Sequence, residues 1–147
     1  MILRLPNLEV IACKTAKALD KAKISYMFVG GFAALYYGST FSTYDLDLVI
    51  KSEKSKTKEL IKNLKESGFK CIRKEVEPLL GSRLFVECCT GSPGPKEIVE
   101  LNFFPVEKKF HEEVFSRKVK HKVKGKNIWL ISPEDLLLDK IQSAKPS

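Results

Sequence analysis

The chain has 147 residues, of which 44% are hydrophobic and 30% are charged, and this composition excludes both intrinsic disorder and a membrane-embedded protein. Its length is that of one ordinary domain and no secretory signal is visible at its N-terminus, so we expect a single cytoplasmic domain over residues 1–147. The formal net charge of +8 comes mostly from lysine, and it fits either an anion-binding face or a solvated surface.

Hydrophobic periodicity predicts the helices and strands in chain order. We expect helices over residues 7–22, 32–37 and 52–67, and a last helix that has Ser132 as its N-cap. We expect strands over residues 26–29, 43–51, 69–75, 82–89, 97–104 and 128–131, whereas the pattern of residues 108–115 assigns neither state. In the third helix, Asn63 is expected on the polar side. The sequence thus predicts an α/β (α+β) domain, with a mixed central sheet of about five strands flanked by helices.

Two glycines and two aspartates carry the chemistry that the sequence suggests. Gly30 and Gly31 follow a buried strand, where they allow a tight turn and a close approach of backbone N–H groups to an anion. Asp45 and Asp47 are two residues apart on a predicted strand, so both carboxylates project from one face. Such a pair suits a divalent cation such as Mg²⁺, especially where substrate phosphates complete its ligands. Each feature alone also fits an ordinary turn or a solvent-facing strand.

The order of strand, Gly-Gly, helix, turn and Asp-x-Asp strand resembles the nucleotidyltransferase superfamily, whose members have the polymerase-β-like fold. The segment is most similar to the small prokaryotic nucleotidyltransferases of the minimal and abortive-infection types, which are found in toxin–antitoxin loci. Residues 132–140, SPEDLLLDK, also resemble the SPEDLxxxK start of the last helix in these relatives. The resemblance covers most of the chain and implies a nucleotidyltransferase-like fold.

The resemblance also implies the residues of an active site. Asp45, Asp47 and a third carboxylate on a later strand would hold two Mg²⁺ (or Mn²⁺) ions. Glu100 is the best match for the third carboxylate, with Glu87 as its rival and Glu97 as a weaker one. The phosphates of a nucleoside triphosphate such as ATP would be bound by Gly30, Gly31, Ser39, Thr43 and Lys140, with Lys51 as a further candidate. Lys140 fits a surface lysine almost equally well.

The implied reaction is transfer of a nucleoside monophosphate from a nucleoside triphosphate to an unidentified acceptor, within a toxin–antitoxin or defence system that includes a partner protein. The alternative is a catalytically inactive member of the same fold that binds a partner protein or nucleic acid. Phe41 stands where relatives usually have arginine, four residues before Asp45. Relatives often continue beyond the lysine of the last helix, whereas this chain ends at Ser147, so we expect a truncated or a reduced member. Both departures bear on catalysis more than on fold.

A basic segment lies near the end of the chain, at residues 117–126, where lysine alternates with valine and histidine. On a strand, one side of this segment would carry Lys118, Lys120, Lys122, Lys124 and Lys126. Such a row suits a phosphate-backbone track, or equally a solvated hairpin edge that lysine protects from aggregation. His111 and His121 fit no motif, and we expect both to be surface residues.

Overall fold

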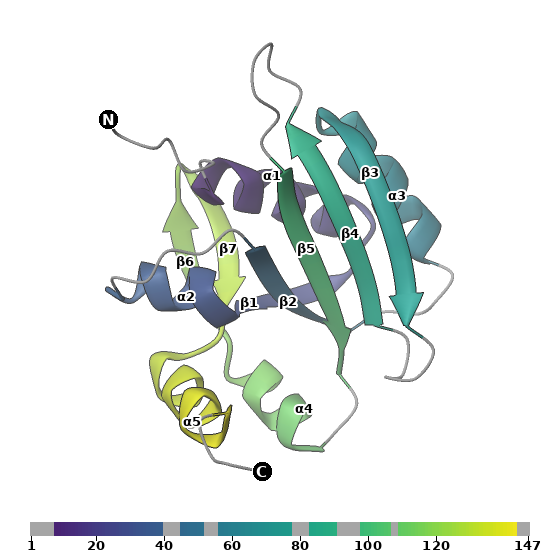
Figure 1. The fold of residues 1–147 in the computed structure, drawn as a ribbon. Helices are drawn as coiled ribbons and strands as arrows, with labels where there is room; N and C mark the ends of the chain where they lie inside the picture. The colour runs from purple at the N-terminus through teal and green to yellow at the C-terminus, as the bar shows by residue number, and fades with distance from the viewer. Residues whose placement is uncertain are drawn as a thin grey trace.

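The computed structural model describes residues 8–39, 45–51, 56–77, 83–90, 98–106 and 109–143 (Figure 1). The helices in these residues are α1 (Leu8–Lys21), α2 (Gly30–Tyr36), α3 (Thr57–Glu66), α4 (Lys109–Ser116) and α5 (Pro133–Ser143). The strands are β1 (Ser25–Val29), β2 (Asp45–Lys51), β3 (Phe69–Glu77), β4 (Arg83–Thr90), β5 (Ile98–Pro105), β6 (Val119–Val123) and β7 (Lys126–Leu130). Each predicted helix and strand is present, and the segment that the sequence left unassigned forms α4. Among the described helices, none is long and apolar enough to cross a membrane.

The described strands form one mixed sheet in the order β3-β4-β5-β2-β1-β7-β6 (Figure 1). The β1–β7 and β2–β5 pairs are parallel, and the other neighbouring pairs are antiparallel. The predicted α/β class, with a mixed sheet flanked by helices, is confirmed. The sheet extends to seven strands because the basic segment turns back as a hairpin. Its two turn residues, Lys124 and Gly125, have φ values of 49° and 81°, and a two-residue hairpin turn of this kind requires positive φ at both positions.

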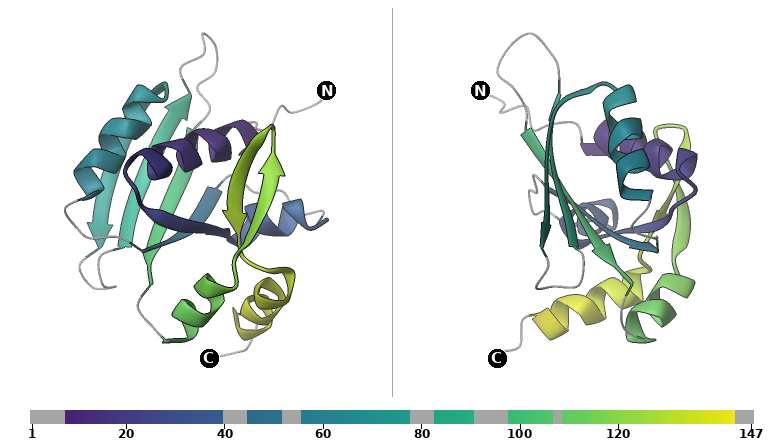
Figure 2. Two further views of the ribbon diagram at one scale, coloured as in Figure 1. Left: turned by 180° about the vertical axis from the view of Figure 1, so that it is seen from behind. Right: turned by 90° about the vertical axis from the view of Figure 1, so that its right-hand side faces the viewer.

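Alternation along the central strands separates a buried face of the sheet from a polar face. Leu46 and Leu48 of β2 are completely buried, whereas Asp45 and Asp47, which alternate with them, are half-buried. Helices α1 and α3 lie side by side over the buried face, while α4 and α5 lie together at one end of the sheet (Figure 2). The packing of the leucines beneath α1 and α3 therefore determines which face of β2 presents its carboxylates.

Asn63 departs from the prediction made for the third helix. Its side chain is only 4% exposed, and its Nδ2 donates a hydrogen bond of 3.1 Å to the backbone carbonyl of Ala18 in α1. The expectation of a solvent-facing Asn63 was wrong because the buried amide finds its partner on another helix, 45 residues away in the chain. A periodic pattern within one helix does not contain that information.

The core packing of α1 gives a test with a matched control. Leu19 in α1 is completely buried, whereas Leu137 in α5 is 61% exposed, and both lie in helices. We expect Leu19→Ala to lower the free energy of unfolding by about 2–5 kcal/mol, because the cavity that it leaves does not refill. We expect Leu137→Ala to change it by no more than about 0.5 kcal/mol. Urea unfolding followed by circular dichroism measures both, and equal losses in the two variants would contradict this packing.

Candidate active site

The candidate site is built on the parallel pairing of β2 with β5. In this register Asp45 lies beside Glu100, and Asp47 lies beside Asn102. Side chains of paired residues on neighbouring strands project to the same face of a sheet, so these four polar side chains share one face. It is the face opposite to the one that carries Leu46 and Leu48. Two segments that lie 55 residues apart in the chain thus combine into one polar surface.

The register distinguishes between the candidates for the third carboxylate. Glu100 lies directly beside Asp45 on the neighbouring strand. The backbone of Glu87 on β4 pairs with Glu100 and is therefore one strand farther from β2, and its side chain lies outside the described residues. Glu97 also lies outside the described residues. Of the two glutamates that lie in described strands, Glu100 and Glu87, Glu100 is the one that pairs directly with β2.

Neighbouring residues hold the Asp47 carboxylate. Asn102 Nδ2 donates a hydrogen bond of 2.9 Å to Asp47 Oδ1. On the other side is Gly30, where an added Cβ would lie only 2.6 Å from Asp47 Oδ2. Gly30 also has a φ of +65°, a conformation that other residues adopt only with strain. One reason for the first glycine of the pair is thus to leave room for the second aspartate, a role that the sequence alone did not reveal.

Asn102 is a site residue that the sequence analysis missed. Its side chain is 5% exposed, and an amide in that position on β5 has the Asp47 carboxylate as its hydrogen-bond acceptor. The sequence feature that could have identified Asn102 is its position two residues after Glu100, which places both side chains on one face of a strand.

The remaining predicted residues fall in different places. Gly31 lies in the first turn of α2, and Ser39 follows that helix, half-buried, with its backbone N–H donating to the carbonyl of Ala34 at 2.8 Å. Thr43 lies outside the described residues, and so does the side chain of Lys140 in α5.

Lys51 is at the opposite end of β2 from Asp45, about 20 Å away at the usual strand rise. Lys51 therefore lies away from the Asp45 end of the strand, and its proposed contact with the triphosphate stays a prediction.

A mostly apolar pocket of about 290 Å³ opens beside Asp47 and Gly30. Its titratable lining residues are Asp47, His111, Asp135 and Asp139. His111 is exposed, as expected, but it lines this pocket. No group of three or more His, Cys, Asp or Glu side chains in the described part of the chain is arranged to hold a metal ion. Two neighbouring carboxylates nonetheless suit Mg²⁺, which commonly takes one or two carboxylates together with substrate phosphates.

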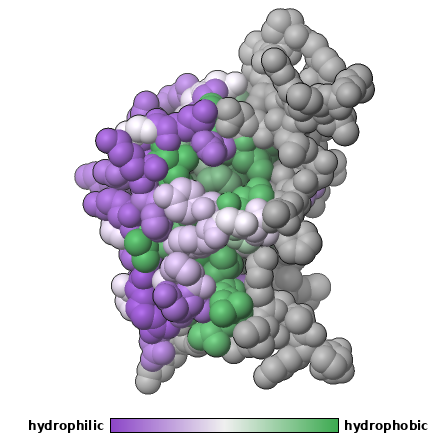
Figure 3. Space-filling view, turned by 90° about the vertical axis from the view of Figure 1, so that its left-hand side faces the viewer, coloured by the Kyte–Doolittle hydropathy of each residue, from purple (hydrophilic) through white to green (hydrophobic). Residues whose placement is uncertain are grey.

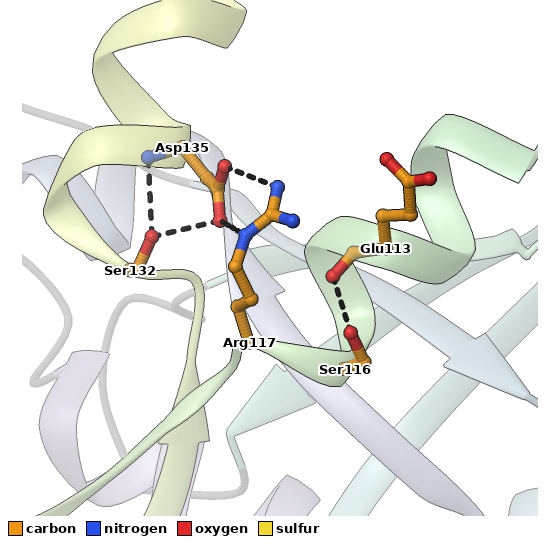
Figure 4. Close-up of polar contacts among 5 residues, drawn as sticks. All are labelled: Glu113, Ser116, Arg117, Ser132 and Asp135. Atoms are coloured by element: carbon orange, nitrogen blue, oxygen red, sulfur yellow. Dashed lines mark hydrogen bonds and ion pairs between the residues drawn. The ribbon is translucent and has the colours of Figure 1, made fainter.

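The first turn of α5 is anchored to the end of α4 (Figure 4). The backbone N–H of Asp135 donates to Ser132 Oγ at 3.1 Å, and the Ser132 hydroxyl donates to Asp135 Oδ2 at 2.8 Å. This geometry agrees with the predicted N-cap role of Ser132. Arg117, just after α4, donates to both carboxylate oxygens of Asp135, at 3.1 and 2.9 Å. These hydrogen bonds lower the pKa of Asp135 below its ordinary value.

His121 connects α2 to the hairpin, and the expectation of an ordinary surface residue was wrong for it. It is half-buried, and its Nε2 lies 3.0 Å from the Tyr37 hydroxyl oxygen. That hydroxyl donates its one proton to the carbonyl of Ile131 at 2.8 Å, so His121 Nε2 is the donor in the first contact. The short helix after Gly30 is therefore fastened to β6 and to the end of β7.

No protein-family model matches the sequence, and no curated protein matches it either. Solved structures do share the fold. A candidate nucleotidyltransferase from Thermotoga maritima superposes with a TM-score of 0.64 and 14% sequence identity, over 97% of this chain and 87% of that one. A candidate nucleotidyltransferase from Helicobacter pylori gives a TM-score of 0.62 and 17% identity over 96% of this chain, which spans 59% of its length. The antibiotic-resistance factor ANT(2'')-Ia gives 0.57 and 15%, over 96% of this chain and 74% of that one.

These similarities, together with the sheet order, establish the fold of the described residues. The chain has the fold of the nucleotidyltransferase superfamily, as the sequence resemblance implied.

The close approach of Gly30 to Asp47 predicts a large effect of a small substitution. We expect Gly30→Ala to displace the Asp47 carboxylate and to weaken any ligand binding that depends on it by at least about tenfold. Gly125→Ala is the matched control, because Gly125 also has a positive φ, of +81°, but an added Cβ there meets nothing within 4 Å. Both variants should lose stability through backbone strain of about 1–2 kcal/mol. An Asp47 carboxylate that keeps its position in a crystal structure of Gly30→Ala would contradict the assigned role.

The Arg117–Asp135 pair predicts a pH dependence of stability. Because the pKa of Asp135 is lowered on folding, the pair stabilises the fold fully above about pH 4, and this contribution is lost as the pH falls through the folded pKa. We expect Asp135→Asn to lower the free energy of unfolding at pH 7, and the difference from the wild type to shrink near pH 3. Glu134→Gln, at the exposed neighbouring position, is the control. A difference that stays constant between the two pH values in urea unfolding would rule out the pair as its cause.

Proposed function

We propose that the protein is a metal-dependent nucleotidyltransferase, which transfers a nucleoside monophosphate from a nucleoside triphosphate to an acceptor. The observation that supports this most directly is the register of β2 with β5, which sets Glu100 beside Asp45 and Asn102 beside Asp47. A domain that only bound nucleic acid would have no use for these carboxylates, because they would repel phosphate unless a cation lay between them.

The carboxylates of Asp45, Asp47 and Glu100 are the proposed ligands of Mg²⁺ or Mn²⁺. Such a metal, when bound, neutralises phosphate charge and lowers the pKa of an attacking hydroxyl. Asn102 orients one oxygen of Asp47 by donating to it, which leaves the other oxygen to face Gly30. The proposed ligands of the triphosphate rest on the resemblance, and they are Gly30, Gly31, Ser39, Thr43 and Lys140.

The proposed reaction is an attack by the acceptor hydroxyl on the α-phosphate, with pyrophosphate as the leaving group. The contribution of this chain is to hold both reactants in line and to provide carboxylates that would hold the cation balancing the charge of the phosphates. The mostly apolar pocket opens beside Asp47, so a reactant bound in it would displace water from that side of the carboxylate. It lies where either a nucleotide or an acceptor can contact it.

The proposed biological setting is a cytoplasmic toxin–antitoxin or defence system, in which the chain acts with a partner protein. This part rests on the resemblance of the Gly-Gly, Asp-x-Asp and SPEDL segments to the small prokaryotic members of the superfamily. A gene for a small helical protein next to the gene for this chain would support it.

The alternative is a catalytically inactive protein of the same fold that binds a partner protein or nucleic acid. The observation in its favour is Phe41, which replaces the arginine that relatives usually have four residues before the first aspartate. The alternative predicts that nucleotide and metal bind weakly or not at all, whereas the proposed enzyme needs both.

Isothermal titration calorimetry tests the proposal. We expect ATP, or another nucleoside triphosphate, to bind the wild type in the presence of Mg²⁺ or Mn²⁺ and to lose most of its affinity when EDTA is added. Asp45→Asn/Asp47→Asn should lose the metal-dependent part of this affinity, by at least about tenfold. The control is Glu112→Gln/Glu113→Gln, which removes two exposed carboxylates from α4 and should bind like the wild type.

Two further variants identify the third carboxylate. Glu100→Gln should weaken metal-dependent binding as the aspartate variant does, and Glu87→Gln should leave it nearly unchanged, because β4 is one strand farther from β2. Metal-independent binding of equal strength in the wild type and in Asp45→Asn/Asp47→Asn would exclude the proposed site.

A further inference from the structure

We propose that α1 and the β6–β7 hairpin form a binding site for single-stranded nucleic acid, separate from the carboxylates of β2 and β5. This hairpin site comprises Lys14 and Lys17 of α1, Tyr26 of β1, and the hairpin residues Lys120, Lys124 and Trp129. It goes beyond the proposed nucleotidyl transfer and does not depend on it.

The hairpin site surrounds an open cavity of about 830 Å³. The five lysines that line it are Lys14, Lys17, Lys120, Lys124 and Lys126, and the one carboxylate in its lining is that of Asp20. Asp20 Oδ2 forms an ion pair of 2.9 Å with Lys126 Nζ, so the one acidic side chain among the described lining residues is already neutralised. Hydrophilic residues cover much of the described surface on the side of the β6 edge, around a hollow with hydrophobic residues (Figure 3). The cavity therefore carries an excess of positive charge that favours a polyanion.

Trp129 supplies an aromatic surface among these lysines. Its ring is half-buried, and the ammonium groups of Lys118 and Lys120 lie 4.9 and 5.0 Å from its centroid. Single-stranded nucleic acids are bound by this combination, in which bases stack on aromatic rings and lysines track the phosphates. A site for a small anion alone would have no need of the ring.

The Tyr26 hydroxyl is a buried donor in the cavity lining. Tyr26 is 1% exposed, and its hydroxyl has no well-formed hydrogen bond in the described part of the chain, although the Trp129 backbone is near it. Burial raises the pKa of Tyr26, so the hydroxyl keeps its proton and can donate. A buried donor without an acceptor is costly, and this one belongs to a residue in the wall of the cavity.

The lysines of the hairpin lie on two strands and the turn between them, and do not form the single row on one strand that the sequence suggested. Lys120 and Lys122 pair with Trp129 and Asn127 on β7, so they share one side of β6. Lys124 lies in the turn, and Lys126 belongs to β7. The lysines of β6 alone would fit protection of an edge strand. Edge protection does not account for Lys14 and Lys17, which reach the same cavity from α1.

Fluorescence anisotropy with labelled oligonucleotides of about 12 residues tests the hairpin site. We expect oligo(U) and oligo(dT) to bind, and Lys17→Gln/Lys120→Gln/Lys124→Gln to weaken binding at least tenfold. The slope of log affinity against log salt should fall by about 0.7 for each lysine–phosphate ion pair that the substitutions remove. Lys58→Gln/Lys62→Gln/Lys65→Gln, which removes three exposed lysines from α3, is the control for net charge. An equal loss of oligonucleotide affinity in the control variant would mean that binding depends only on the net charge of the protein, and it would overturn the proposal.

The aromatic part of the site has its own test. Trp129→Leu should weaken oligonucleotide binding roughly tenfold, and Trp129→Phe should restore most of it, because either aromatic ring can stack with a base. Comparison of oligo(U) with oligo(dT) distinguishes RNA from DNA as the ligand. Inorganic polyphosphate is used as a competitor. If it binds and oligonucleotides fail to displace it, the ligand of the site is a simple polyanion and not a nucleic acid, and the proposal is overturned.

The proposals for the hairpin site and for the carboxylate site can be disproved independently of each other. Asp45→Asn/Asp47→Asn should bind oligonucleotides as the wild type does, whatever its affinity for nucleotide and metal. Loss of oligonucleotide binding in that variant would contradict a separate site, and unchanged binding in the hairpin variants would do the same.

Discussion

The pairing of β2 with β5 is the constraint on which the rest of the structure depends. Side chains alternate between the two faces of a strand, so a shift of one residue would exchange the leucines and the aspartates of β2. Leu46 and Leu48 are completely buried on one side, and Leu101 and Phe103 are completely buried on β5. The core therefore fixes the register, and the register in turn sets Glu100 beside Asp45. Burial of these apolar side chains therefore also determines where the carboxylates lie.

The segments around this pair keep the polar face in place from both sides. Gly30 leaves space for the Asp47 carboxylate at the end of β1, and Asn102 donates to it from β5. The helix that starts at Gly30 is tied to β6 and β7 through the contacts of Tyr37. The positive charge of the chain acquires two roles in this account, since the hairpin site is proposed to attract nucleic acid while other lysines are exposed on the surface.

The sequence predicted the features that depend on residues near one another in the chain. The strands, the helices, the Gly-Gly turn and the shared face of Asp45 and Asp47 follow from short-range periodicity, and all lie largely where they were expected. The features that it missed join distant segments. The sequence favoured Glu100 over Glu87 only by its match to a pattern, whereas strand pairing shows that Glu100 lies beside Asp45 and Glu87 one strand farther from β2. Asn63 lies in the core because its amide reaches a carbonyl of α1, a contact that no local pattern contains.

The central claim is that Asp45 and Glu100, on two different strands, act together on one metal ion. A double-mutant cycle of Mn²⁺ affinity, measured by electron paramagnetic resonance with ATP present, tests it most directly. The account predicts that Asp45→Asn and Glu100→Gln each weaken Mn²⁺ binding, and that the double variant loses much less than the sum of the two single losses. Losses that simply add, or a wild type that binds no Mn²⁺, would contradict it.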